Sequence, residues 1–231
     1  MLATSVLTQI GTYILYILLP LLILYIGYLI ITKAFNDMGF SSLEATIIVF
    51  VSFLLGSGIV DEFVGFSFSN IHLFVFGNWI VGINTGGAII PIILSAYLSI
   101  KNKLQLSRIF LGIIIVAIIT YFVTEPIPQI GIVAKFPFWL LPVFFASLAS
   151  IILSWKDKCK AAPLAYISGT IGVLIGADFL HLISLLENEI QTTRNAVIGG
   201  ASIFDMVFIT GILAVIVDGV LVYQKRKKES Y

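Results

Sequence analysis

Seven long apolar runs, separated by short polar loops, are the feature that most limits what this chain can fold into. A helix that crosses a bilayer needs roughly 20 mostly apolar residues. The chain is 59% hydrophobic and only 11% charged, whereas a soluble domain carries roughly 25% charged residues. The sequence therefore predicts one all-α domain, a polytopic bundle of about seven transmembrane spans at residues 8–32, 42–60, 79–100, 109–124, 137–155, 162–186 and 196–223.

Segment 61–78 does not fit this pattern, because its apolar and aromatic residues are interrupted by polar ones. Aromatic side chains suit the headgroup region, so we expect an interfacial or re-entrant segment there. The first apolar run is too long for the core of a cleavable signal peptide, and no basic residue precedes it. We therefore expect it to remain as a helix. The single cysteine, Cys159, excludes an intrachain disulfide.

Basic residues divide unevenly between the two sides of such a bundle. One side receives only Lys135 and Arg194. Cytoplasmic loops of membrane proteins carry the excess of lysine and arginine, so the richer side is predicted to be cytoplasmic. This gives a multi-pass protein of the plasma membrane, with its N-terminus outside and its C-terminus in the cytoplasm. The richer side holds eleven basic residues: Lys33, Lys101, Lys103, Arg108, Lys156, Lys158, Lys160, Lys225, Arg226, Lys227 and Lys228.

Two aspartates lie deep inside predicted spans, where a charge is costly and calls for a reason, whereas Asp218 lies near the inner end of the last span, two turns before Lys225. Asp178 lies nine residues before Glu187, and Asp205 lies ten residues after Asn195. At about 1.5 Å per residue, both are expected roughly 13–15 Å below the outer surface. Their helices are consecutive and antiparallel, so the two carboxylates can face each other. Such a pair cannot easily ionise twice, and a shared proton serves either acid–base chemistry or proton-coupled transport.

Four further polar residues are candidates for binding or proton relay. His181 follows Asp178 at i+3, on nearly the same helical face, although a hydrogen-bonded helix contact explains it equally simply. Asn84 and Thr85 lie in a span interrupted by glycines and Pro91, which suggests a kinked or opened helix. Ser202 lies in the small-residue start of the last span. With only two histidines in the chain, a multi-histidine zinc site is excluded, and neither a metal nor a cofactor is expected.

Glycines on the same spans favour close helix packing. Gly172 and Gly176 have the small-xxx-small spacing that lets two helix backbones approach. The structural alternative for the whole constellation is that the glycines only pack helices and the aspartates only bond across them.

Three blocks carry a resemblance to a known family: Gly82–Pro91, Gly169–Asp178 and Gly199–Asp205. They resemble a prokaryotic membrane-protein family catalogued as domain of unknown function 1614, from about the second span to the seventh. That resemblance implies an integral membrane protein and supplies no accepted activity. A fainter likeness is to intramembrane aspartyl proteases of the presenilin and signal-peptide-peptidase type, which use one aspartate on each of two consecutive helices. In their motifs tyrosine precedes the first aspartate and glycine the second, whereas Ala177 and Phe204 stand here. Their later Pro-Ala-Leu element has no counterpart.

Three functions follow as alternatives. The first is a hydrolase of the aspartyl-protease kind, in which Asp178 and Asp205 form the catalytic pair. The second is a proton- or cation-coupled transporter, although no convincing internal repeat is present. The third is a scaffold whose polar residues only fix helix packing. The expected partners are the lipid bilayer and either a membrane-embedded substrate or a small cation, and no nucleic acid, because the basic residues lie in short loops. The sequence leaves the oligomeric state open.

Overall fold

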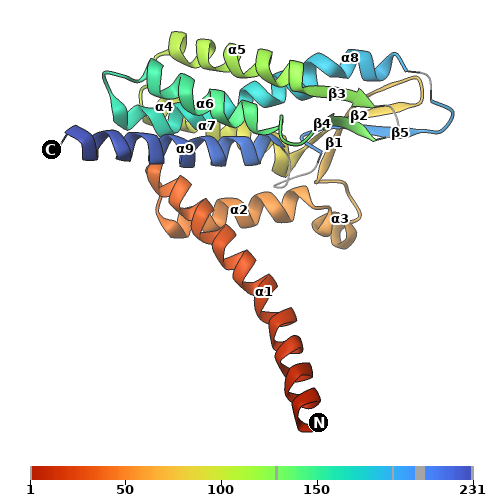
Figure 1. Ribbon diagram of the computed structural model, residues 1–231. Coiled ribbons are helices and arrows are strands. Elements are labelled where there is room, and N and C mark those ends of the chain that lie inside the picture. The colour runs from red at the N-terminus through yellow and green to blue at the C-terminus, as the bar shows by residue number, and fades with distance from the viewer. Residues whose placement is uncertain (1, 128–129, 189, 201–205, 230–231) are drawn as a thin grey trace.

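The computed structural model describes residues 2–127, 130–188, 190–200 and 206–229. This part of the chain is mostly helical and carries two small sheets (Figure 1). The helices are α1 (Leu2–Asp37), α2 (Ser42–Gly56), α3 (Ile59–Val64), α4 (Ile90–Lys101), α5 (Leu106–Val123), α6 (Leu140–Leu153), α7 (Ala161–Val173), α8 (Leu180–Leu186) and α9 (Met206–Glu229). The strands are β1 (Asn70–Phe76), β2 (Trp79–Asn84), β3 (Thr124–Ile127), β4 (Gly131–Ala134) and β5 (Arg194–Ile198). Short helical turns are η1 (Thr85–Ile89) and η3 (Leu174–Phe179), both π-helical, and the 3₁₀ turn η2 (Lys158–Lys160).

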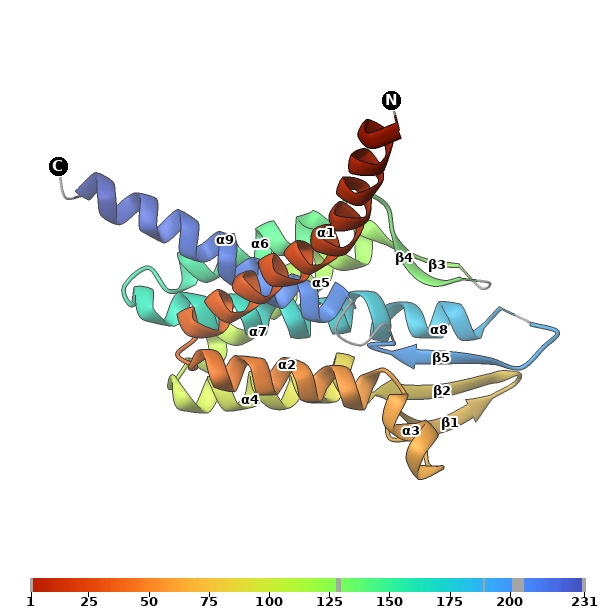
Figure 2. The same ribbon diagram turned by 90° about the horizontal axis from the view of Figure 1, so that it is seen from below.

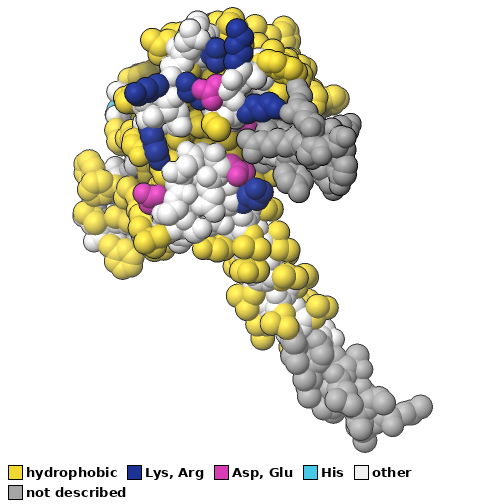
Figure 3. Space-filling model, turned by 90° about the vertical axis from the view of Figure 1, so that its left-hand side faces the viewer, with side chains coloured by type: hydrophobic (Ala, Val, Ile, Leu, Met, Phe, Trp, Pro, Cys, Tyr) yellow, Lys and Arg dark blue, Asp and Glu magenta, His cyan; other side chains and the backbone are white. Residues whose placement is uncertain are grey.

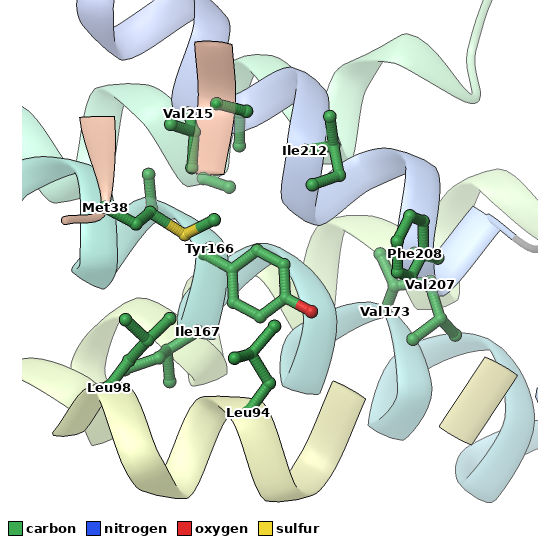
Figure 4. Packing of buried hydrophobic residues seen from close by; sticks show 14 of the residues in the cluster. Met38, Leu94, Leu98, Tyr166, Ile167, Val173, Val207, Phe208, Ile212 and Val215 are labelled. Carbon is green, nitrogen blue, oxygen red and sulfur yellow. The ribbon is translucent and has the colours of Figure 1, made fainter. Parts of the chain in front are cut away.

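Helix α7 forms the centre of the bundle, and α4, α5, α6 and α9 pack around it. Nearly all of its side chains are buried, because alanine, glycine, serine and threonine let the neighbouring helices come close. A Cβ on Gly169 would lie 3.3 Å from Cα of Gly211 on α9. One on Gly172 would lie 2.6 Å from Cβ of Val116 on α5. Figure 4 shows the larger side chains that fill the space around these contacts, with Tyr166 of α7 at their centre.

Helix α1 leaves the bundle over most of its length (Figures 1 and 2). Only its last turns enter the core, where Ala34 and Phe35 are fully buried. The preceding stretch exposes leucine, isoleucine and tyrosine side chains on all sides, with Leu24 69% exposed and Ile23 60% exposed. Such an unbroken apolar surface is unfavourable in water, and a lipid environment accommodates it.

Among the described residues, three helical segments are long and apolar enough to cross a membrane: Leu15–Asp37, Leu106–Val123 and Lys158–Leu186. The prediction of seven spans is therefore too high. The other four apolar helices are shorter: Ser42–Gly56, Thr85–Lys101, Leu140–Leu153 and Met206–Leu221. Helix α6, for example, has 14 residues and measures about 21 Å, whereas the hydrocarbon core is roughly 30 Å thick.

The all-α prediction is also wrong, because strands replace the ends of three predicted spans. Strand β2 occupies the start of span 79–100, and β3 begins at the end of span 109–124. The last predicted span, 196–223, begins inside β5, and the helix described within it is α9. The physical reason is local. Trp79, Ile80 and Val81 favour a strand, and the glycines that follow β2 and β5 interrupt the helical run. In β3, Pro126 cannot continue the helix.

The two sheets lie together at one end of the bundle, beside α8 (Figures 1 and 2). In the larger sheet the order is β1-β2-β5, with β1 antiparallel to β2 and β2 parallel to β5. Trp79 pairs with Arg194 at one end of the parallel ladder, and Ile83 pairs with Ile198 at the other. Strands β3 and β4 form a separate antiparallel hairpin.

Segment 61–78, predicted as interfacial or re-entrant, folds into the end of α3, the strand β1 and the turns around them. Every residue of β1 is exposed, and Phe63 and Phe66 of the preceding segment are 86% and 64% exposed. Asp61 ties this segment together, since its carboxylate accepts hydrogen bonds from the backbone N–H groups of Phe68 and Ser69 and from the Ser69 hydroxyl.

Candidate functional site

Asp178 lies where the bundle meets the two sheets. It belongs to the π-helical turn η3, which interrupts the long helix between α7 and α8. Its side chain is half-buried, and its Oδ2 atom accepts a hydrogen bond of 2.8 Å from the backbone N–H of Gly199, the residue directly after β5. Single π-helical turns inside helices are frequent at functional sites. The carboxylate predicted from the sequence is thus fixed to the end of a strand.

Gly199 can occupy this position only because it lacks a side chain. Its φ of +68° lies in the left-handed region that favours glycine. A Cβ here would lie 2.7 Å from the carbonyl carbon of Gly87 and 2.8 Å from Cβ of Ala88. The end of β5 therefore presses against the turn η1, and this close contact brings the Gly199 N–H to Asp178.

A cavity of about 410 Å³ opens beside Asp178, within the usual size range of ligand sites. Strand β5 and Gly200 form one part of its lining, and β4 with Ile130 forms another part. Trp79 and two leucines of α8 complete the lining. The lining residues are Trp79, Ile130, Gly131, Ile132, Asp178, Leu182, Leu185, Arg194, Asn195, Ala196, Val197, Ile198 and Gly200.

Strands β4 and β5 both line the cavity, and they belong to different sheets and do not pair with each other. In a parallel ladder, alternate residues direct their backbone N–H and C=O groups to opposite edges. The N–H of Arg194 donates to the carbonyl of Asn78, so Arg194 and every second residue after it face β2. Asn195, Val197 and Gly199 then direct their backbone groups to the other edge of β5, and the first two of them line the cavity. The bond from Gly199 to Asp178 belongs to this outward row.

Asn84, predicted to bind or relay, instead positions the turn η1. Its side chain is 1% exposed. Its Nδ2 donates to the carbonyl of Gly56 and to Oδ1 of Asn70, both at 3.0 Å, while its Oδ1 accepts from the N–H of Gly87 at 2.8 Å. Because Gly87 also contacts Gly199, the hydrogen bonds of Asn84 hold η1 in the position where it meets the end of β5. Neither Asn84 nor Thr85 lines the cavity, and the Thr85 hydroxyl donates to the carbonyl of Phe68.

His181 turns away from the cavity and contacts α5. Its Nε2 lies 3.2 Å from the carbonyl oxygen of Tyr121, and the two rings stack with centroids 4.6 Å apart. The role of His181 as a relay stays a prediction. Within the described residues, no group of three or more histidine, cysteine, aspartate or glutamate side chains could hold a metal ion.

Asp205 and Ser202, the other two predicted site residues, lie outside the described residues. The chain is described up to Gly200, which lines the cavity, and again from Met206, the first residue of α9. Whether Asp205 pairs with Asp178 therefore stays a prediction.

Sequence reasoning missed the strand side of this site. Arg194, Asn195 and Val197 were placed in a loop and in the start of a helix, although the run Asn195–Ile198 followed by two glycines is a typical strand signal. The same Gly-Gly-Ala triplet follows β2 at Gly86 and β5 at Gly199. That recurrence is the signal that could have indicated two related strand–turn–helix units.

A family model matches residues 59–217, well over half of the chain, and its description is Protein of unknown function (DUF1614). The chain belongs to this family. The matched range includes the larger sheet, both π-helical turns and the helices around α7. No curated protein and no solved structure matches the chain. The likeness to intramembrane aspartyl proteases therefore gains no support from these comparisons.

Proposed function

We propose that this DUF1614 protein is an integral membrane hydrolase that binds a peptide in extended conformation along the outward edge of β5, beside Asp178. One observation carries the proposal: the Gly199 N–H that holds the Asp178 carboxylate lies on the edge of β5 that does not pair with β2, and Asn195 and Val197 of the same row are among the residues that line the cavity. A peptide strand added to this edge would run directly past the carboxylate.

Strand addition suits the chemistry of this edge. An exposed sheet edge binds an extended peptide through main-chain hydrogen bonds, and pockets for alternate side chains give specificity. Apolar side chains from Leu182, Leu185 and Ile132 offer such pockets, and Arg194 adds one positive charge at the same cavity. A peptide is favoured over a small polar solute because the groups along this edge are those of a backbone.

Hydrolysis requires a second carboxyl group, and Asp205 is the candidate. One carboxylate would take a proton from water as the water oxygen attacks the peptide carbonyl carbon. The other, protonated, would donate its proton to the leaving nitrogen as the C–N bond breaks. Asp205 lies six positions after Gly199 in the sequence, and a chain of this length spans at most about 20 Å.

The membrane placement follows from the three span-length helices and from the charges. Figure 3 shows lysine and arginine side chains gathered on the end of the bundle opposite to the sheets. In our proposal this end faces the cytoplasm of the cell and the sheets lie toward the outer surface. Open sheet edges do not occur in contact with lipid tails. Asp178, at the inner margin of the sheets, would then lie near the outer boundary of the hydrocarbon layer.

The test is cleavage of a peptide library by the full chain in liposomes, with products identified by mass spectrometry. Wild type should release fragments, and Asp178→Asn and Asp205→Asn should each lower the rate at least about 100-fold, since acid–base catalysis contributes roughly 10²–10⁴-fold. Asp157→Asn is the matched control, because its carboxylate pairs with Lys160 at the other end of the bundle. Cleavage by both aspartate variants at the wild-type rate would contradict the hydrolase.

A second candidate, proton- or cation-coupled transport, is favoured by one observation. Buried hydroxyls without a hydrogen-bond partner among the described residues lie along the bundle, including those of Ser168 and Thr210. Beyond them Asp218 is 3% exposed and accepts a hydrogen bond from Ser150. Liposomes loaded with a pH-sensitive dye test this path. Proton flux that Asp218→Asn abolishes and Asp157→Asn preserves would favour transport over hydrolysis.

A further inference from the structure

A second cavity lies at the end of the bundle opposite to Asp178, between the turn that joins α4 to α5 and the turn that joins α6 to α7. Its volume is about 170 Å³. Lys103, Arg108, Lys156 and Lys160 all contribute to its lining, together with Ser154 and Asp157. Figure 3 looks onto this end of the molecule, where the basic side chains gather.

Among the residues that line this cavity, basic side chains outnumber acidic ones. Asp157 is its only acidic lining residue, and it pairs with Lys160 at 3.0 Å. In the part of the chain that the structure describes, no carboxylate lies within 4 Å of Lys103, Arg108 or Lys156. Lys33 and Lys135 differ in this respect, because each pairs with its own acid. Like charges held together repel, so the cluster lacks a counter-anion.

Uncharged polar groups at the same cavity also lack hydrogen-bond partners among the described residues. Ser154 is 1% exposed, and its hydroxyl has no hydrogen-bond partner among the described residues. Helix α5 begins beside the cavity after Gln105, whose side chain makes no capping bond. Helix α7 also lacks a side-chain cap at Lys160, but the turn η2 before it satisfies the N–H of Ala161, which donates to the carbonyl of Lys158. The start of α2 differs, since Ser41 and Glu44 form a capping box there. Uncapped helix starts present N–H donors and partial positive charge.

We propose that this cavity binds a phosphate group. Arginine pairs with phosphate through two parallel hydrogen bonds, lysines neutralise its charge, and a hydroxyl and helix N–H groups bind the remaining oxygens. Each of these donor types is present here, and the acceptor is missing. The phosphate belongs either to the headgroup of an anionic phospholipid, since basic pockets between transmembrane helices bind such groups, or to a soluble phosphate compound.

The experiment uses the full chain in two arms. In the first, protein in a neutral detergent is titrated with inorganic phosphate and followed by ³¹P line broadening. In the second, protein in nanodiscs of phosphatidylcholine with or without phosphatidylglycerol is analysed by native mass spectrometry for retained lipid. The test variant is Arg108→Gln with Lys156→Gln, and Ser154→Ala is a milder one. The matched control is Lys33→Gln with Lys101→Gln, which removes the same charge outside the cavity.

Saturable binding in either arm, weakened at least about tenfold by the Arg108 and Lys156 double variant, supports the site, because each variant removes a charge-assisted hydrogen bond. Binding of inorganic phosphate identifies a soluble ligand, and retention of phosphatidylglycerol alone identifies the lipid. The proposal is overturned if neither probe binds saturably. It is also overturned if the control double variant loses as much affinity as the test variant, since the attraction would then come from the whole basic surface.

Discussion

Replacing Gly199 with alanine should destabilise the protein in two ways, through an unfavourable backbone conformation and through a steric overlap. The residue has a φ of +68°, and a non-glycine residue pays about 1–2 kcal/mol in this region. The new Cβ would also overlap Gly87 and Ala88, at 2.7 and 2.8 Å, and overpacking of a tight contact costs about 1–3 kcal/mol. Together we expect a loss of about 2–5 kcal/mol.

The assay is equilibrium unfolding in mixed micelles of mild detergent and increasing dodecyl sulfate, followed by tryptophan fluorescence. Trp79 lies on the same cavity and reports on its opening. Gly77→Ala is the matched control, since Gly77 has a φ of +58° but no atom lies within 4 Å of the position that its Cβ would take. It should lose only the backbone part, about 1–2 kcal/mol. Equal losses for Gly199→Ala and Gly77→Ala would refute the close contact between the end of β5 and η1.

Three further predictions concern single residues whose side chains make hydrogen bonds. Hydrogen bonds, above all from Ser69, lower the pKa of Asp61. The stabilisation by the ionised carboxylate should therefore be complete above its unfolded pKa of about 4 and disappear as the pH falls through the lowered pKa. The thermal unfolding midpoints of wild type and Asp61→Asn should converge at low pH, and a difference that does not change with pH would contradict this. Asn84→Ala should cost about 1–3 kcal/mol, because it leaves buried groups unpaired, whereas an unchanged unfolding midpoint would argue against the Asn84 bonds. His181→Phe keeps the stacking on Tyr121 and loses one hydrogen bond, so the free energy of unfolding should fall by about 0.5–1.5 kcal/mol. If His181→Phe and His181→Ala lower it equally, the stacking contributes nothing and the prediction is contradicted.

Much of the helical part of this fold could be predicted from the sequence. Each of the seven apolar runs contains a helix, because an uninterrupted apolar stretch of this length has few other solutions. Helix length was harder to predict. The apolar strand β2 continues directly into η1 and α4, so the run from Trp79 to Ile100 looks like one span. Hydropathy alone does not distinguish a strand that ends in glycines from the first turns of a helix.

The site could be predicted only in part. A carboxylate inside an apolar run drew attention to Asp178, and the structure places it on a cavity. Its partner Gly199 was recognised only as a small residue for packing, because a backbone donor leaves no chemical signature in a sequence. The same holds for the outward edge of β5. Which side of a strand stays unpaired depends on the pairing with β2, and residues so far apart along the chain give no local signal of that pairing.

The parallel pairing of β2 with β5 also sets an order of events during biosynthesis. The last residue of β2, Asn84, and the first of β5, Arg194, are separated by 110 positions. Ribosomes add roughly 5–20 residues per second, so β2 waits roughly 5–20 s before its partner strand has been made. Throughout this time the cavity lacks one wall, and Gly199 is not yet there to hold Asp178. Helices α1 to α8 are therefore synthesised before the second wall of this cavity, and of the described helices only α9 follows it.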